Sequence, residues 1–430
     1  MHTQPHFQAL KFITCGSVDD GKSTLIGRLL VDSKTALLDQ IAGVSKTGEI
    51  DLAQFTDGLT AEREQGITID VAYRYFSTAS RKFIIGDTPG HEQYTRNMVT
   101  AASSADAAVV LVDATKLVWQ NATNDEPVQL LPQTKRHSLL AHLLRVPSIV
   151  FAINKLDAVE NAETAFANIS AALHSMAEQA GIEVNAIVPV SALKGDNVVE
   201  LSSRWPFYSG RSLLQILEQL PAQSALDEER QVPTALPIQW LDKDSSSATT
   251  AQGRRTFWGR LASGALKVGQ ELQVFPSGQK AIVAQLLDHA REPLQEDQGL
   301  NTSYGIVLDR EVDVSRGDWL LAPDTFHAQR SISATVAWLD EEPLQAGRTY
   351  LALHGHRWVK AKVTAITQRF DIHTLTPQDA TQLQTNEIGS VQLALQEPIT
   401  AVAYAQSKAL GALILVDTAT HKTSGAALVR

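Results

Sequence analysis

Cysteine is almost missing from this chain, since Cys15 is the only one in 430 residues. A single cysteine excludes an intramolecular disulfide and is typical of a reducing compartment, so we expect a cytoplasmic protein. No apolar run reaches the roughly 20 residues that a membrane-spanning helix needs, and residues 1–9 are polar and too short for a signal peptide. An excess of basic charge is missing too, because the net charge is −10, so we do not expect a nucleic-acid partner.

One glycine-rich stretch, residues 16–23, lies between two apolar segments. Residues 10–15 before it are typical of a buried strand, and residues 24–30 after it have the Leu/Ile spacing of a helix that packs on a sheet. Strand, glycine-bracketed loop and helix together predict a P-loop, whose N–H groups point at phosphate oxygens. Lys22 is expected to reach the β- and γ-phosphates, and the Ser23 hydroxyl to bind Mg²⁺.

A second motif follows the predicted strand at residues 81–86. Asp87 is expected beside Mg²⁺, and the N–H of Gly90 can contact a γ-phosphate because no side chain intervenes. His91 is expected to orient the attacking water, although a histidine after a Pro-Gly turn is, taken alone, more often a surface residue. Thr68 is either an ordinary strand threonine or a switch residue that closes onto Mg²⁺ when a γ-phosphate is present.

Two further motifs indicate the base. The Asp157 carboxylate would accept hydrogen bonds from the guanine N1–H and amine, a donor pair that adenine lacks, so it disfavours ATP. Asn154 is expected to brace the surrounding loops, and the stem of Lys155 to lie over the base. The backbone N–H groups of Ser191 and Ala192 are placed to meet the guanine O6.

The joint order of these motifs predicts a GTP-binding domain with Mg²⁺. The predicted catalytic residues are Lys22, Gly90 and His91. The predicted metal ligands are Ser23, Thr68 and Asp87. The predicted nucleotide-binding residues are Gly16, Ser17, Val18, Asp19, Asp20, Gly21, Lys22, Ser23, Thr24, Asp87, Asn154, Lys155, Asp157, Ser191 and Ala192.

The hydrophobic pattern changes along the chain, and its length suggests about three domains. In the first half, apolar strands alternate with helical stretches such as residues 162–180, which predicts a mostly parallel sheet with flanking helices. After a Pro- and Gln-containing break at residues 221–237, short β-branched and aromatic runs are separated by turn residues, which predicts small antiparallel barrels. We therefore predict a multidomain α/β plus all-β protein, with a P-loop GTPase domain over residues 1–230 and two β-barrels over residues 231–327 and 328–430.

The whole chain resembles the translation-factor class of GTPases, and residues 259–270 look like the second domain of that class. Within the class it most resembles the large, GTP-hydrolysing subunit of bacterial sulfate adenylyltransferase (ATP sulfurylase). The stretches that carry this narrower resemblance are residues 16–30, 61–76, 83–98, 205–210 and the turn at 370–375. The pair Asp19 and Asp20 is telling, because elongation factors usually have His or Ser at the second position.

The resemblance implies that GTP and Mg²⁺ are the cofactors, with the site residues as named above. It also implies a partner, a small ATP-pyrophosphatase-like subunit that joins sulfate to AMP in a heterodimer or higher assembly. GTP hydrolysis on the large subunit would then drive formation of adenylyl sulfate from ATP and sulfate, the first step of sulfate assimilation. The sequence contains no second P-loop, so we expect no fused adenylyl-sulfate kinase.

Two alternatives stay open. The same architecture serves translation elongation factors that carry aminoacyl-tRNA, although Asp19, Asp20 and residues 205–210 and 370–375 argue against that function. Residues 116–131 are an insertion relative to the resembled family; they could contact a partner, but we expect them to be solvated. This insertion also keeps open a GTPase of the same kind whose partner has changed.

Overall fold

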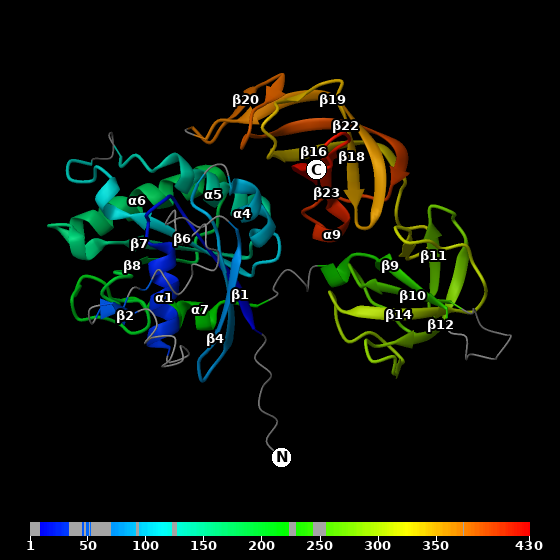
Figure 1. The fold of residues 1–430 in the computed structure, drawn as a ribbon, viewed down its shortest axis with the longest axis horizontal. Coiled ribbons are helices and arrows are strands. Elements are labelled where there is room, and N and C mark those ends of the chain that lie inside the picture. Colours follow the sequence, from blue (N-terminus) through cyan, green and yellow to red (C-terminus); the bar gives the residue numbers. More distant parts are fainter. Residues whose placement is uncertain are drawn as a thin grey trace, which may run out of the picture. The chain divides into compact units, whose positions relative to one another are not determined.

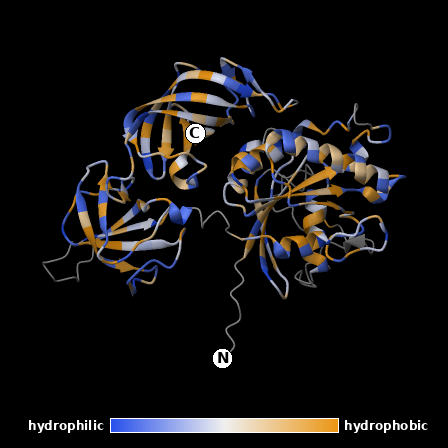
Figure 2. Cartoon of the chain, turned by 180° about the vertical axis from the view of Figure 1, so that it is seen from behind, coloured by the Kyte–Doolittle hydropathy of each residue, from blue (hydrophilic) through white to orange (hydrophobic). Residues whose placement is uncertain are grey.

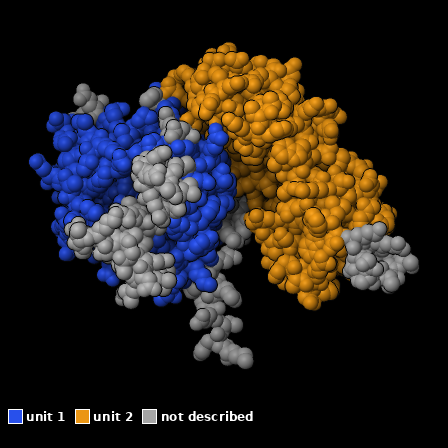
Figure 3. Space-filling view, in the orientation of Figure 1, with its two compact units in different colours: residues 1–224, 372–375 blue, residues 225–371, 376–430 orange. Residues whose placement is uncertain are grey.

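The computed structural model describes residues 9–33, 45–46, 49–50, 52, 70–91, 94–122, 127–222, 229–243, 255–372 and 374–430. The chain divides into two compact units, residues 1–224 with 372–375 and residues 225–371 with 376–430 (Figure 3). The first unit contains a mostly parallel sheet with helices, and the second contains two antiparallel barrels, so the predicted fold class is confirmed. The exact boundaries at 230/231 and 327/328 stay a prediction.

A six-stranded sheet in the order β4-β5-β1-β6-β7-β8 forms the centre of the first unit. Its strands are β1 (Leu10–Cys15), β4 (Ala72–Ser77), β5 (Lys82–Asp87), β6 (Ala107–Asp113), β7 (Ser148–Asn154) and β8 (Ala186–Pro189). All neighbours are parallel except β4, which pairs antiparallel with β5 at the edge. The carboxyl ends of the five parallel strands therefore meet at one edge of the sheet, where ligands bind in open α/β folds.

Helices cover both faces of this sheet (Figure 1). The helices of the unit are α1 (Lys22–Asp32), α4 (Thr95–Ala102), α5 (Pro132–Leu143), α6 (Ala162–Ala180) and α7 (Leu213–Gln219), with the 3₁₀ turns η3 (Ala114–Lys116) and η4 (Leu156–Ala158) and the short strands β2 (Ser45–Lys46) and β3 (Glu49–Ile50). Leucines of α1 and α7 share one core with residues of β1, β6 and β7. Among the described residues, no helix combines the length and the apolar character needed to cross a membrane.

The central strands are continuously apolar because both faces are covered. Every residue of β6 and of β7 is buried. Strands that are buried on both sides lack polar alternation, which is why they stand out in the sequence as uninterrupted runs. Figure 2 shows these strands as hydrophobic bands, whereas the strands of the second unit alternate between hydrophobic and hydrophilic residues.

The first barrel follows the predicted all-β pattern. Its strands are β9 (Ala235–Lys243), β10 (Arg255–Arg260), β11 (Glu271–Phe275), β12 (Lys280–Leu287), β13 (Pro293–Leu294), β14 (Ser303–Leu308) and β15 (Trp319–Leu321). They pair in the order β11-β15-β9-β10-β14-β12, and β12 pairs back with β11, which closes the ring. Closure removes the unpaired strand edges that an open sheet would expose.

The second barrel is built in the same way. Its elements are β16 (Gln329–Trp338), β17 (Leu344–Gln345), β18 (Thr349–His354), β19 (Arg357–Phe370), β20 (Pro377–Asp379), β21 (Gln382–Leu383), β22 (Ile388–Ile399), α9 (Lys408–Gly411), β23 (Ala412–Asp417) and β24 (Thr423–Val429). The ring runs β18-β23-β24-β16-β22-β19 and closes where β19 pairs with β18. Alternate residues of β19 are buried, which is the period-two pattern of a strand with one face in a core.

The expectation that the insertion at residues 116–131 is solvated is wrong for much of its described part. Leu117, Trp119, Val128 and Leu130 are all buried. The indole Nε1 of Trp119 donates to the carbonyl of Ala114 at 3.1 Å, and the amide of Asn168 on α6 donates to the Trp119 carbonyl at 2.8 Å. The apolar residues are spaced among polar ones, so the sequence concealed a segment that packs against its own domain.

Candidate functional site

The P-loop lies where predicted, between the end of β1 and the start of α1. Gly16 and Gly21 have φ values of +143° and +91°, which L side chains rarely adopt. A Cβ atom on Gly21 would lie 2.4 Å from Nδ2 of Asn154, and one on Gly16 would lie 2.6 Å from the carbonyl oxygen of Leu111. Both glycines therefore allow the loop to fit closely against the ends of β6 and β7.

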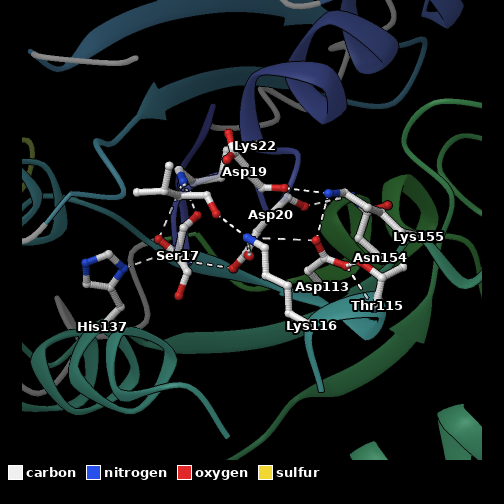
Figure 4. A network of polar contacts seen from close by, with 12 residues as sticks. Ser17, Asp19, Asp20, Lys22, Asp113, Thr115, Lys116, His137, Asn154 and Lys155 are labelled. Carbon is white, nitrogen blue, oxygen red and sulfur yellow. Dashed lines mark hydrogen bonds and ion pairs between the residues drawn. The ribbon is translucent and has the colours of Figure 1, made fainter. Parts of the chain in front are cut away.

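Side chains from the helix and from a neighbouring loop hold the P-loop carbonyls (Figure 4). The bonds run from Nζ of Lys22 to the Ser17 oxygen at 2.8 Å, from Nζ of Lys155 to the Asp19 oxygen at 2.7 Å, and from Nδ2 of Asn154 to the Asp20 oxygen at 2.8 Å. In a trans peptide the carbonyl and the following N–H point in opposite directions, so a held carbonyl also orients an N–H group. Oriented N–H groups at the start of a helix are what anion binding requires.

The loop after β7 is hydrogen-bonded both to the P-loop and to the loop after β8. Oδ1 of Asn154 accepts a hydrogen bond from the N–H of Ala192 at 2.9 Å, while its Nδ2 bonds to the P-loop, so this residue braces three loops. Lys155 also pairs with Asp113 at the end of β6, at 2.7 Å. In the described part of the chain the Asp157 carboxylate makes no hydrogen bond or ion pair, so its oxygens are available to an incoming base.

The loop after β8 differs from expectation in one respect. The N–H of Ser191 donates to the carbonyl of Asp196 at 3.1 Å, and the N–H of Ala192 donates to Asn154. Neither N–H is free in this arrangement, although both residues lie next to the Asn154 motif as predicted. For either N–H to reach a guanine O6, its present bond would have to open, the one to Asp196 for Ser191 and the one to Asn154 for Ala192.

The motif after β5 lies against the P-loop. The Asp87 carboxylate is 1% exposed and accepts a hydrogen bond from Oγ1 of Thr14 at 3.3 Å. A Cβ atom on Gly90 would lie 2.5 Å from Nζ of Lys22, so this glycine touches the P-loop lysine. Nε2 of His91 is buried and has no hydrogen-bond partner within the residues that the structure describes. Thr68, the predicted switch threonine, lies outside the described residues.

Comparisons with known proteins agree with this geometry. Residues 8–222 match the family model for the elongation factor Tu GTP binding domain, and residues 331–430 match the GTP-eEF1A C-terminal domain-like model. Over its full length the chain is 42% identical to sulfate adenylyltransferase subunit 1 of Aeromonas hydrophila subsp. hydrophila, covering 87% of that protein. It is 43% identical to sulfate adenylyltransferase subunit 1 of Citrobacter koseri, again over the full chain and 88% of that protein.

The chain belongs to the sulfate adenylyltransferase subunit 1 family. It is therefore a member of a family of GTPase subunits, and its first domain is of the GTP-binding type. The match to a solved structure of sup35 complexed with GDP covers 98% of this chain and 94% of the sup35 chain, with 21% sequence identity and a TM-score of 0.43. A superposition at that level supports no functional assignment.

The stretch at residues 205–210, which carried part of the resemblance to the sulfate adenylyltransferase subunit, packs on the GTPase domain. Trp205 is buried, and the rings of Phe207 and Tyr208 both lie 5.9 Å from the ring of Phe166 on α6. The hydroxyl of Tyr208 donates to the carbonyl of Arg211 at 2.9 Å. Of the other signature turn, residues 370–375, His373 lies outside the described residues.

The candidate site contains buried charges of both signs. Burial lowers the pKa of Lys22, while Asp87 and Asp20 nearby partly oppose the shift. Burial raises the pKa of Asp20, and Lys116 opposes that change. A buried ammonium gains most from an added negative charge, because little water competes for it.

Three residues of the site were missed by sequence reasoning. Nδ1 of the buried His137 accepts a hydrogen bond from the N–H of Gly16 at 3.0 Å, and burial lowers the pKa of His137 to about 3, so the ring is neutral at pH 7. Lys116 pairs with Asp20 of the P-loop, and Asp113 pairs with Lys155 in the loop after β7. Asp113 ends an apolar strand just as Asp87 does, which is a usable signal, whereas His137 lies within a helix and carries none.

Proposed function

We propose that this chain is the GTP-hydrolysing large subunit of sulfate adenylyltransferase and couples GTP hydrolysis to the formation of adenylyl sulfate from ATP and sulfate. The observation that carries the proposal is the meeting of the P-loop with the motifs after β5, β7 and β8 at one sheet edge. This site lies in a chain that is 42% identical to its relatives over its full length. The formation of adenylyl sulfate from ATP and sulfate is strongly uphill in free energy. GTP hydrolysis would therefore supply the free energy that drives it.

The phosphates would be bound by the N–H groups of the P-loop and by the first turn of α1, including that of Thr24. Lys22 would leave the Ser17 carbonyl, which it now contacts at 2.8 Å, and would reach the β- and γ-phosphates. Because its ammonium is buried beside two carboxylates, it is already held close to the phosphate position.

The residues present fit a magnesium ion. The Ser23 hydroxyl in the first turn of α1 and the Asp87 carboxylate are hard oxygen donors of the kind that Mg²⁺ prefers. Mg²⁺ in nucleotide sites is commonly held by one or two protein groups together with phosphate oxygens. We propose Ser23, Asp87 and Thr68 as its holders; bound there, the ion would neutralise phosphate charge.

Hydrolysis would use the turn that follows β5. The N–H of Gly90 would contact the γ-phosphate, since the absence of a side chain lets the backbone approach Lys22 closely. His91 would orient the attacking water through Nε2, the buried nitrogen that has no partner in the described part of the chain. Lys22 would stabilise negative charge that develops on the transferred phosphoryl group.

Guanine would be selected by the Asp157 carboxylate, with the stem of Lys155 over the base and Asn154 holding the loop. Guanine offers N1–H and an amine to this carboxylate, and adenine offers no such pair. The N–H groups of Ser191 and Ala192 are proposed as donors to O6, after the bonds from Ser191 to Asp196 and from Ala192 to Asn154 have opened.

The adenylyl transfer itself would take place on a partner, proposed as the small ATP-pyrophosphatase-like subunit, in a heterodimer or a higher assembly. The relatives carry the word subunit in their names. We place this assembly in the cytoplasm and at the first step of sulfate assimilation.

The test is co-expression of the chain with such a partner, followed by purification of the complex and measurement of adenylyl sulfate formation with and without GTP. We expect faster formation with GTP, and no acceleration in the matched variant Lys22→Ala, whose complex should still assemble. Equal rates with and without GTP, or no complex at all, would refute the coupling.

A translation factor that carries aminoacyl-tRNA is the second candidate, because both matched family models are named after elongation factors. The sequence identity of 42% to a sulfate adenylyltransferase subunit, over the full length of this chain, favours the first candidate. A gel-shift experiment with aminoacyl-tRNA separates the two. GTP-dependent tRNA binding would favour the second function and count against the first.

A further inference from the structure

A charged pair at the P-loop, Asp20 and Lys116, takes no direct part in the proposed hydrolysis step. The Asp20 side chain is completely buried; its Oδ2 accepts a hydrogen bond from the N–H of Ser17 at 2.6 Å, and its Oδ1 lies 3.0 Å from Nζ of Lys116. Lys116 comes from the end of the 3₁₀ turn η3 that follows β6, far from the P-loop in the sequence. Figure 4 shows its ammonium over the loop, between Asp20 and Asp113.

A buried carboxylate is unfavourable beside a phosphate-binding loop. GDP and GTP bring several negative charges to the loop, and unscreened like charges repel strongly where water is excluded. The opposing ammonium of Lys116 cancels the charge of Asp20 at close range. Without it, among the described residues, only the N–H of Ser17 and the nearby ammonium of Lys22 would oppose the charge of the carboxylate, and Lys22 is also needed by the phosphates.

Lys116 also holds the loop's backbone. Its Nζ donates to the carbonyl of Val18. This carbonyl lies between that of Ser17, which Lys22 holds, and that of Asp19, which Lys155 holds. With the bond from Asn154, the carbonyls of four consecutive residues, Ser17 to Asp20, each accept from a different side chain. The peptide that Lys116 anchors carries the N–H of Asp19, whose φ of +60° lies in the left-handed region.

The backbone of Lys116 is itself fixed. Oδ1 of Asp113 caps the turn η3 by accepting from the N–H of Thr115 at 2.9 Å and from its hydroxyl at 2.6 Å. The other oxygen of Asp113 pairs with Lys155 at 2.7 Å. Trp119 closes the turn by its bond to the Ala114 carbonyl. The ammonium is therefore held on the loop before any nucleotide arrives.

We propose that Lys116 is a positioning residue of the nucleotide site, which neutralises Asp20 and fixes the Val18 peptide so that the P-loop is shaped for phosphates in advance. The inference rests on the proposed guanine-nucleotide site. It goes beyond that function, because it assigns the loop's affinity to a pair of charges neither of which touches the base or the reacting atoms.

The experiment measures dissociation constants and release rates for fluorescent GDP and a non-hydrolysable GTP analogue on the full chain. The variants are Lys116→Met, Asp20→Asn, the double variant, and Lys82→Met as a matched control. Lys82 is an exposed lysine at the start of β5, the end of the strand away from the site. Thermal melts of the nucleotide-free proteins check that each variant folds.

We expect Lys116→Met to weaken GDP binding roughly ten- to hundredfold, mainly through faster release, because hydrogen bonds to charged groups are lost. The loss should be larger for the GTP analogue, which brings more negative charge. In the double variant the carboxylate is also neutral, so its affinity should lie within about fivefold of Asp20→Asn alone. If Lys116 only stabilised the fold, Lys116→Met would weaken binding as much in the Asp20→Asn background as in the wild-type chain.

Three outcomes would overturn the inference. They are Lys116→Met binding like Lys82→Met, a fold loss in the double variant that equals the product of the two single fold losses, or equal fold losses for GDP and the GTP analogue. If Lys116→Met fails to fold, the comparison of the double variant with Asp20→Asn decides, and a further tenfold loss in the double would refute it. Failure of the wild-type chain to bind guanine nucleotides would instead refute the proposed function.

Discussion

Gly90→Ala tests how closely the turn after β5 and the P-loop must approach. The added Cβ would lie 2.5 Å from Nζ of Lys22 and 2.9 Å from both the carbonyl carbon of Ser17 and the nitrogen of Val18. The lysine end can swing aside, but the Ser17–Val18 peptide is backbone and must retreat by about 0.5 Å to regain ordinary contact at 3.4 Å. The loop and the turn would then both be displaced from the γ-phosphate.

A misplacement of about 1 Å costs on the order of a hundredfold in rate for a positioned reacting group, so we expect single-turnover GTP hydrolysis to fall about ten- to hundredfold. GDP affinity should fall less than about tenfold, because GDP lacks the γ-phosphate that Gly90 would contact. Gly347→Ala in the second barrel is the control for a glycine-to-alanine change away from the site. Its added Cβ meets no atom within 4 Å, while its φ of +93° adds a backbone strain that Gly90 does not have. Hydrolysis by Gly90→Ala within threefold of wild type would refute the reasoning.

Three further predictions concern the base, the pH dependence and the insertion. Asp157→Asn should shift preference from GTP towards xanthosine triphosphate, since the amide reverses the hydrogen-bond polarity; unchanged GTP affinity in a titration would count against the assignment. Burial lowers the pKa of His354 in the folded state to about 4, whereas its pKa in the unfolded chain is about 6.5. Below about pH 6.5 the unfolded chain therefore binds a proton that the folded chain does not, and the free energy of unfolding falls. Wild type should therefore lose about 2 kcal/mol more than His354→Gln between pH 7 and pH 5 in urea unfolding, and parallel losses would contradict this. Trp119→Ala should lower the free energy of unfolding by about 3–5 kcal/mol, whereas a loss under about 1 kcal/mol would restore the view that the insertion is solvated.

The nucleotide site was predictable where a local pattern had a single physical meaning. A glycine-rich loop between a strand and a helix has few uses, so the P-loop and its Lys22 could be located directly. The strand ends at Asp87 and Asn154 could be placed at the same edge of the sheet, because parallel strands bring their carboxyl ends to one edge. The α6 helix was predicted with its observed bounds, Ala162–Ala180.

The rest could not be predicted because it depends on contacts between distant segments. His137 meets Gly16 across 121 residues, and Lys116 meets Asp20 across 96. The same applies to the N–H of Ala192, which a contact with Asn154 occupies. The insertion was misjudged for a related reason, since the burial of Trp119 depends on a helix that begins some forty residues later.

The sequence by itself determined the fold class and predicted a guanine nucleotide as the ligand, because glycine spacing, strand periodicity and the Asp157 motif are local properties. Only the tertiary structure decided how the P-loop is held. Its carbonyls are bound by side chains from two other loops and its own helix, and its buried aspartate is balanced by a lysine that no local pattern connects to it. Charge balance in a buried site depends on distance in space, and distance in the sequence does not predict it.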